Sequence, residues 1–235
     1  MSSNEATPAD PAMPAMPAKS AKSASPAAGR ARRAFDRDKA LAIALEQFWT
    51  HGYDTTSVAS LTKAMGINPP SLYAAFGDKR QLFDEAVGLY VRSYASPLQG
   101  GDARSAIAAM LRRLAADYTD PSHPPGCFII TGATNCGPGS QEVKAMLRAM
   151  REESKAAIAA RIRADIDAER LPADTDADGL AAFYAVVVQG MNQQAWDGTG
   201  RETLDRVADA AMAAWPEPAH PPLRRLPDGG PARHA

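Results

Sequence analysis

Apolar side chains recur three or four residues apart along most of the chain, which is the spacing that one face of an α-helix presents. Alternating strand patterns and hairpin turns are almost absent from the sequence. We therefore expect an all-α protein of about nine helices. Eight of them follow from the spacing, over about 36–50, 57–65, 69–76, 79–94, 107–118, 141–170, 178–195 and 201–215.

Prolines mark the two ends of the chain as different from its middle. Five of the nineteen prolines lie in residues 1–33 and six lie in residues 216–235. Proline costs about 3 kcal/mol inside a helix, and these segments hold too little apolar surface to offset the entropy of ordering them. Both ends are predicted to be disordered, and the first is a basic arm that ends in Arg32 and Arg33.

Composition limits the class of protein but does not name a partner. The chain of 235 residues has 45% hydrophobic and 23% charged residues and a net charge of −1, which is ordinary for a globular protein. Its longest apolar run, 181–188, is too short to cross a bilayer, and the N-terminus lacks the features of a secretory signal. A cytoplasmic location follows as an expectation. A claim of DNA binding must rest on local motifs.

Residues 52–83 hold such a motif, because two short helices flank a glycine. Thr56 is placed to cap the first helix, and Gly66 supplies a left-handed turn. Asn68 is placed to cap the second helix, whose first turn tolerates Pro69 and Pro70 because N–H groups there have no helical partner. This is the spacing of a helix-turn-helix.

The second helix of the motif has one apolar side. Leu72 and Phe76 are expected to anchor it, which leaves Ser71, Tyr73 and the helix start pointing outward. A helix held in this way can enter the major groove of DNA.

A longer pattern surrounds the motif. Its residues are Gly52-Tyr53, Thr55-Thr56, Val58, Gly66-Ile67, Leu72-Tyr73-Ala74-Ala75-Phe76, Lys79 and Leu82. With them, residues 35–94 resemble the DNA-binding domain of the TetR/AcrR family of bacterial transcriptional repressors. A weaker likeness over residues 189–198 resembles the penultimate helix through which many members dimerise.

The resemblance implies a division of the chain and a role for the motif. Between the disordered basic arm predicted over 1–33 and the disordered tail predicted over 216–235, it implies a three-helix DNA-binding domain over 34–78 and a helical ligand-binding and dimerisation domain over 79–215. Phosphate contacts are implied for Thr56, Tyr73 and Lys79, and contacts with base edges for Pro69, Pro70 and Ser71. The predicted DNA-binding set is Arg32, Arg33, Thr56, Asn68, Pro69, Pro70, Ser71, Tyr73 and Lys79.

One departure from the family pattern concerns sequence readout. Members often carry His, Tyr or Arg where this chain has Ala74 and Ala75. Alanine can touch a thymine methyl group but cannot donate to guanine, so readout would depend on apolar contact and DNA shape. A protein-interaction module that has lost DNA binding is the alternative that this departure suggests.

The second half is implied to enclose a ligand cavity and to form a homodimer. Apolar residues predicted to line a pocket for a hydrophobic or aromatic inducer are Met110, Leu114, Tyr118, Phe128, Met146, Met150, Phe183 and Trp196. Residues predicted to form the dimer interface are Phe183, Val187, Met191, Leu204, Val207 and Ala211.

Cys127 and Cys136 are the two cysteines of the chain. On one helix their nine-residue separation gives about 13 Å of rise, too far for a disulfide within the subunit. Each is either a small buried hydrophobe or a sensor thiol, and Cys127 is the better sensor because a helix start favours thiolate. With His123 they match no metal-site spacing, so no metal or cofactor is expected.

The predicted function is a transcriptional repressor that binds a palindromic operator as a homodimer. A small molecule or thiol modification would release it, and a redox or electrophile sensor acting through Cys127 is the alternative form. An enzyme with Cys127 as nucleophile is a rival from another class. That rival lacks a matching His-Asp arrangement, a phosphate loop and a Glu-x-x-His pair, so we do not expect an enzyme.

Overall fold

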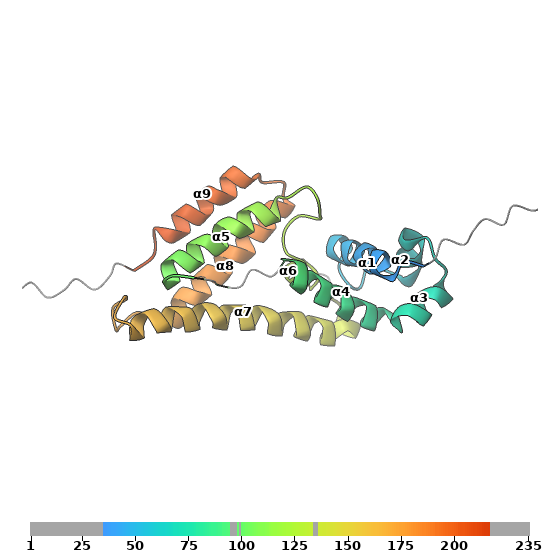
Figure 1. Ribbon diagram of the computed structural model, residues 1–235, viewed down its shortest axis with the longest axis horizontal. Coiled ribbons are helices and arrows are strands. Elements are labelled where there is room, and N and C mark those ends of the chain that lie inside the picture. The colour runs from blue at the N-terminus through green and yellow to red at the C-terminus, as the bar shows by residue number, and fades with distance from the viewer. Residues whose placement is uncertain (1–34, 95–97, 99, 134–135, 217–235) are drawn as a thin grey trace, which may run out of the picture. The chain divides into compact units, whose positions relative to one another are not determined.

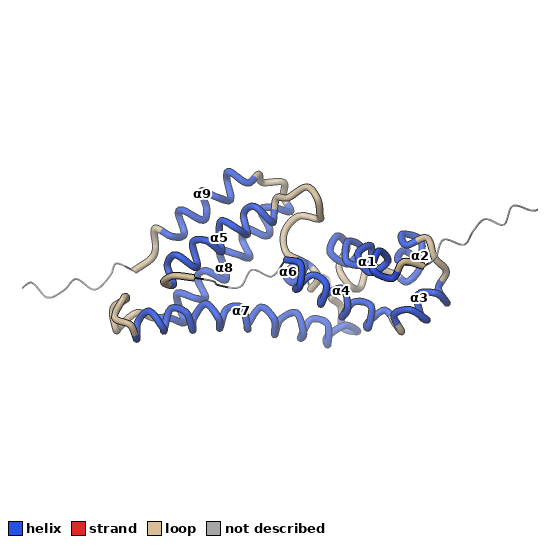
Figure 2. Tube along the Cα trace, viewed as in Figure 1, coloured by secondary structure: helices blue, strands red, loops and turns tan. Residues whose placement is uncertain are grey.

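The computed structural model describes residues 35–94, 98, 100–133 and 136–216. Across these residues the chain forms α-helices and one short 3-10 helix, with no strand (Figure 2), which confirms the all-α prediction. The elements are α1 (Arg37–His51), α2 (Val58–Met65), α3 (Pro69–Phe76), α4 (Lys79–Tyr94), α5 (Ala103–Tyr118), α6 (Phe128–Thr131), η1 (Pro138–Ser140), α7 (Gln141–Asp167), α8 (Ala177–Trp196) and α9 (Arg201–Met212) (Figure 1).

Aspartates begin three of the longer helices. Asp36, Asp102 and Asp176 each accept a hydrogen bond from the backbone N–H three residues further on, at 3.0, 2.7 and 2.9 Å. The first N–H groups of a helix have no partner within it, so such a side chain both satisfies a donor and places negative charge at the positive end of the helix. The starts of α1, α5 and α8 are thus fixed locally.

Aromatic side chains form the core of the first part of the described chain. Helices α1 to α4 pack with α6 and the first half of α7 around Phe48, Trp49 and Phe83, which are at most 2% exposed. The rings of Phe48 and Phe83 meet edge to face at 5.0 Å, and those of Phe83 and Phe128 at 5.4 Å. Phe128 lies on α6, so this core includes residues beyond the helix-turn-helix.

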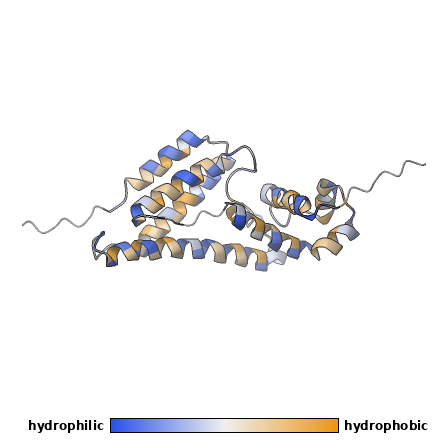
Figure 3. Ribbon diagram, viewed as in Figure 1, coloured by the Kyte–Doolittle hydropathy of each residue, from blue (hydrophilic) through white to orange (hydrophobic). Residues whose placement is uncertain are grey.

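A second core joins α5, α8, α9 and the later part of α7. Its fully buried members include Ile107, Leu111, Ile162 and Tyr184. Helix α5 lies along α9, and α8 packs against α7. The ribbon of α7 alternates between hydrophobic and hydrophilic residues along its length (Figure 3). This is expected when apolar residues recur on one face of a helix.

Several predicted helix ends are wrong. Helix α7 ends at Asp167 rather than near residue 170, because Glu169 adopts a left-handed φ of 57° and the Asp165 carbonyl accepts the N–H groups of Arg170 and Leu171. Helix α9 ends at Met212 rather than at 215. The single helix expected across the two cysteines is also wrong, since α6 is only four residues long.

The predicted domain boundary falls between α3 and α4, and it stays a prediction. In the structure α4 packs along α1 and contributes Phe83 and Tyr90 to the first core. The predicted basic arm over 1–33 and the tail beyond residue 216 lie outside the described residues. Among the helices that are described, none is long and apolar enough to span a membrane.

Candidate nucleic-acid interface and thiol site

Helix α3 presents one side to the core and the other to solvent. Leu72 and Phe76 are 0% and 3% exposed, whereas Tyr73 is 49% exposed. Pro69 and Pro70, in the first turn, are also exposed, and Ser71 is half-buried. The N-terminal turn and the Tyr73 side of α3 are therefore free to approach a ligand.

Two residues of the turn set how the chain enters α3. Gly66 has φ 68° and ψ 31°, a left-handed conformation that glycine adopts without steric cost. The Asn68 side chain accepts the Ser71 N–H at 2.9 Å, and the two prolines follow as the first helical residues. The turn geometry predicted for the helix-turn-helix is what the structure contains.

The cap of α2 differs from the prediction. Ser57, not Thr56, accepts the N–H that begins the helix, from Ser60 at 3.0 Å. Thr56 is 1% exposed and its hydroxyl donates to the Gly52 carbonyl at 2.7 Å. A phosphate contact by this side chain would require that hydroxyl to leave its carbonyl.

Lys79 begins α4, three residues after the end of α3. Its ammonium nitrogen lies 4.2 Å above the ring centroid of Tyr53, within the range of a cation–π contact. Partial burial lowers the pKa of Lys79, and the negative charge of Asp54 acts in the opposite direction. The ring limits the positions that this cation can take.

Sequence reasoning missed Arg37, which supports α3 from behind. Its guanidinium lies 4.6 Å above the Phe76 ring, donates to the Ala75 carbonyl at 3.2 Å and pairs with Glu85 at 2.7 Å. The partners are 38 and 48 residues away along the chain, so no local pattern could have indicated them. Arg32 and Arg33, which were predicted to reach DNA, lie outside the described residues.

Cys127 lies where several helices meet. The Tyr90 hydroxyl of α4 donates to the Cys127 sulfur at 3.2 Å, and the Cys127 backbone N–H donates to the Asn192 side chain of α8 at 2.6 Å. Burial, followed by the neighbouring thiol, raises the pKa of Tyr90 and that of Tyr118 on α5 far above their usual range, which keeps both hydroxyls protonated as donors. Cys127 thus contacts α4 through its thiol and α8 through its backbone N–H, and the sequence indicated neither Tyr90 nor Asn192 as a partner.

Cys136 has a different environment, although both cysteines are free thiols. Partial burial is the main cause that raises the pKa of Cys136, and the Asp54 carboxylate adds to it. The two cysteines do not lie on one continuous helix, because α6 ends at Thr131, so the 13 Å rise expected between them does not apply. The short α6 also removes the basis for activating Cys127 by a helix dipole.

Comparisons with known proteins agree over most of the chain. Residues 40–86 match the model of the bacterial regulatory proteins of the tetR family, and residues 103–211 match that of the tetracyclin repressor-like C-terminal domain. The HTH-type transcriptional repressor ComR of Escherichia coli (strain K12) is 32% identical over 194 residues, which cover 79% of this chain and 91% of ComR. The chain belongs to the TetR family. It is a TetR-type transcriptional regulator with a helix-turn-helix domain.

Two further likenesses bear on this TetR-family chain. BdcR, an HTH-type transcriptional repressor of Escherichia coli (strain K12), is 32% identical over 190 residues, 79% of this chain and 90% of BdcR. A cysteine mutant of the TetR family regulator CifR, solved with a 26-base-pair operator DNA, is 43% identical with a TM-score of 0.73, covering 78% of this chain and 98% of that one. These relatives are regulators, which agrees with the prediction that the chain is not an enzyme.

The six residues predicted for the TetR-type dimer interface divide into two groups. Met191, Leu204 and Ala211 are at most 5% exposed within the single chain, because they pack in the second core. Phe183 and Val207 are 40% and 36% exposed, and Val187 is half-buried. Val186, which the sequence prediction omitted, is 67% exposed on α8.

The eight predicted pocket residues do not gather in one place. Tyr118 is buried in the second core, with Met110 and Leu114 packed against that core. Phe128 is buried in the first core, with Met146, Met150 and Trp196 against it, and Phe183 is exposed. The pocket stays a prediction.

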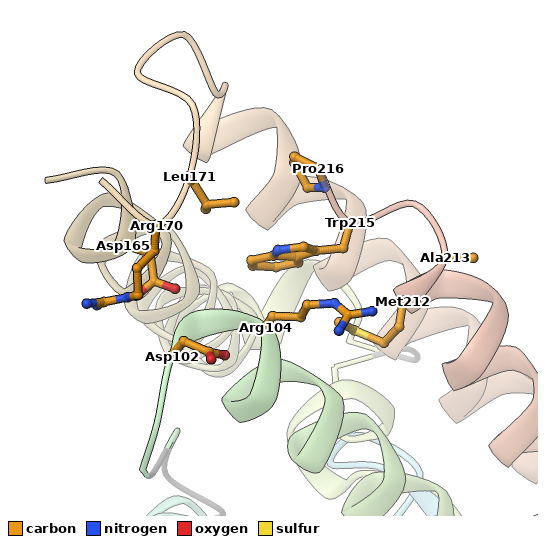
Figure 4. Close-up of a pocket in the computed structure, with 9 residues that line it drawn as sticks. All are labelled: Asp102, Arg104, Asp165, Arg170, Leu171, Met212, Ala213, Trp215 and Pro216. Carbon is orange, nitrogen blue, oxygen red and sulfur yellow. The ribbon is translucent and has the colours of Figure 1, made fainter. Parts of the chain in front are cut away.

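Two hollows occur elsewhere in the described part of the chain. One of about 420 Å³ includes Arg104, Asp165, Arg170 and Trp215 in its lining, at the start of α5 and beyond the end of α9 (Figure 4). None of the predicted pocket residues lines it. A second hollow of about 520 Å³ includes Phe183, the one predicted pocket residue in its lining.

Proposed function

We propose that this TetR-type regulator represses transcription as a homodimer that binds a palindromic operator through α3 and is released when Cys127 is modified. The observation that supports the DNA-binding role is the outward side of α3, where Tyr73 is exposed, followed within three residues of the end of α3 by Lys79 at the start of α4. The residues predicted to bind DNA would line this contact, with Arg32 and Arg33 adding phosphate contacts. Its place of action is the cytoplasm, where operator DNA is accessible.

A homodimer accounts for the exposed apolar side chains of α8 and α9. Phe183, Val186 and Val207 are large hydrophobic residues left at the surface of the single chain. Pairing of two copies about a twofold axis would cover these residues and would place two α3 helices on one duplex. Two identical α3 helices related by a twofold axis require a palindromic site.

Modification of Cys127 would reach DNA through α4. This helix carries Lys79 in its first turn and Tyr90, whose hydroxyl contacts the thiol. Tyr90 is 8% exposed and its hydroxyl contacts the half-buried sulfur, so a bulky group on the sulfur would break that contact and press on α4. Displacement of α4 would move Lys79 away from its phosphate and lower the affinity for DNA.

The test compares the two thiols. The wild-type protein, Cys127→Ser and Cys136→Ser are each titrated against a fluorescent duplex that the wild-type protein has selected from a random-sequence library. The titrations are repeated after treatment with N-ethylmaleimide. We expect treatment to weaken binding at least tenfold in the wild-type protein and in Cys136→Ser, and to leave Cys127→Ser unchanged. Protection by Cys136→Ser instead would contradict the role of Cys127.

A small hydrophobic or aromatic inducer is a second candidate signal for release. The hollow beside Trp215 has a volume of about 420 Å³, which is within the range of pockets that hold small ligands. Such an inducer would act equally on the wild-type protein and on Cys127→Ser. The same titration, run with candidate compounds in place of N-ethylmaleimide, separates the two signals.

A further inference from the structure

Asp54 contacts a distant part of the chain, outside both the outward side of α3 and the surroundings of Cys127. It lies in the loop between α1 and α2, and its carboxylate accepts the Gly137 N–H at 2.5 Å and the Ser140 hydroxyl. These donors are 83 and 86 residues away along the chain, and Ser140 is the residue that precedes α7. The loop that precedes the helix-turn-helix is thus fastened to the start of α7.

The chemistry of this contact favours the ionised carboxylate. Hydrogen bonds from Ser140 and Gly137 hold the pKa of Asp54 below its usual range. Hydrogen bonds to an ionised acceptor are stronger than those between neutral groups. Ser140 is 9% exposed, so its hydroxyl has little access to water and would lose its acceptor if Asp54 were removed.

The loop also positions the residues next to DNA. Tyr53 immediately precedes Asp54, and its ring packs edge to face on Phe83 at 4.9 Å. The Lys79 ammonium lies over the same ring, and the Asp54 charge offsets part of the effect of burial on the pKa of Lys79. A loop free to move would leave this cation with a less defined place.

We propose that Asp54 is a positioning residue for operator binding, which fastens the α1–α2 loop to the start of α7 and thereby holds Lys79 in place for a DNA phosphate. This inference rests on the proposed function of the α3 surface. It links the helix-turn-helix to the segment that follows Cys136, through an acidic residue whose own charge repels DNA.

The charge of Asp54 and its positioning role predict opposite changes in DNA affinity when the residue is replaced. Asp54 is an exposed acidic residue near the predicted phosphate-binding surface. Removing its charge lowers the repulsion of DNA, so electrostatics alone predicts that Asp54→Asn binds more tightly. If Asp54 holds Lys79 in place, Asp54→Asn binds more weakly.

The experiment measures affinity as a function of salt for full-length wild-type protein, Asp54→Asn, Ser140→Ala and the control Glu46→Gln. Glu46 is an exposed acid on α1, so its replacement removes the same charge without touching the contact. The probe is a duplex that the wild-type protein selects from a random-sequence library. We expect Asp54→Asn to bind about tenfold more weakly and Glu46→Gln to bind as tightly as wild type or more so.

The salt dependence distinguishes positioning from general damage. Each lost phosphate contact lowers the slope of log affinity against log salt by about 0.9, so loss of Lys79 from both subunits lowers it by about 1.8. Ser140→Ala should weaken binding and lower the slope, as Asp54→Asn does. If Asp54→Asn does not fold, Ser140→Ala alone tests the inference. Equal or tighter binding by these variants, or weaker binding with an unchanged slope, overturns the inference. If the wild-type protein selects no duplex, the proposed function itself fails.

Discussion

Gly126 offers a sharp test of the packing around Cys127, because a single methyl group there has no room. Its φ is 72°, and a Cβ atom at this position would lie 2.4 Å from the Asn192 side-chain oxygen and 2.9 Å from the Trp196 indole nitrogen. Both of these atoms already form hydrogen bonds. The Asn192 oxygen accepts the Cys127 N–H at 2.6 Å, and the Trp196 indole N–H donates to the Thr131 hydroxyl at 3.0 Å. Gly126→Ala must therefore displace α8 side chains as well as strain the backbone.

Gly66 is the matched control. Its φ of 68° is nearly the same, but a Cβ atom there meets nothing within 4 Å. A left-handed alanine costs about 1 to 2 kcal/mol, which is the whole expected loss for Gly66→Ala. Gly126→Ala should lose that amount plus about 1 to 3 kcal/mol for disrupted buried hydrogen bonds, or about 2 to 5 kcal/mol in total.

Urea unfolding monitored by circular dichroism at one fixed protein concentration gives both free energies of unfolding. The difference between the two variants should be about 1 to 3 kcal/mol, with Gly126→Ala the less stable. Equal losses would refute the close packing of Gly126 against α8, and with it the physical connection between Cys127 and that helix.

Three further predictions concern single side chains. Asn68→Ala should lower the stability by about 1 kcal/mol through loss of the α3 cap, and Asn68→Ser should restore most of it, as thermal unfolding would reveal. Asp165→Ala should lower the free energy of unfolding by about 3 kcal/mol, because the buried carboxylate binds the Ala103 N–H and Arg170. Asp209→Ala is the control, because Asp209 pairs with Arg112 at the surface, and its loss should cost less than about 1 kcal/mol. The pKa of Asp102 is lowered by its hydrogen bonds with Ser105, so its contribution to stability is present above the unfolded-state pKa and is lost as the pH falls through the folded-state pKa. Asp102→Asn should flatten that acid limb in a pH series of unfolding curves, and an unchanged limb would contradict the assignment.

Local signals in the sequence were enough to predict the helix-turn-helix. Gly66, Asn68 and the two prolines act within a few residues of themselves, so their effect can be inferred without knowing the fold. Leu72 and Phe76 then set which side of α3 is buried, and the structure agrees.

Contacts between distant segments could not be predicted in the same way. Met191 and Leu204 were expected at an interface, but they complete the core of their own chain, and nothing in helical spacing separates these two outcomes. The contact between Asp54 and Ser140 joins residues 86 positions apart. Residue spacing predicts one helix across the two cysteines, yet Gly126 adopts a left-handed φ before α6 and Gly132 follows directly after it.

Binding of DNA by the exposed side of α3 is the central claim, and one titration tests it directly. A fluorescent duplex selected by the wild-type protein is titrated with wild-type protein and with Tyr73→Ala, whose side chain is 49% exposed and contributes little to the core. We predict salt-dependent, sequence-specific binding by the wild-type protein and at least tenfold weaker binding by Tyr73→Ala, with unchanged thermal stability. Equal binding by the two proteins would contradict the claim.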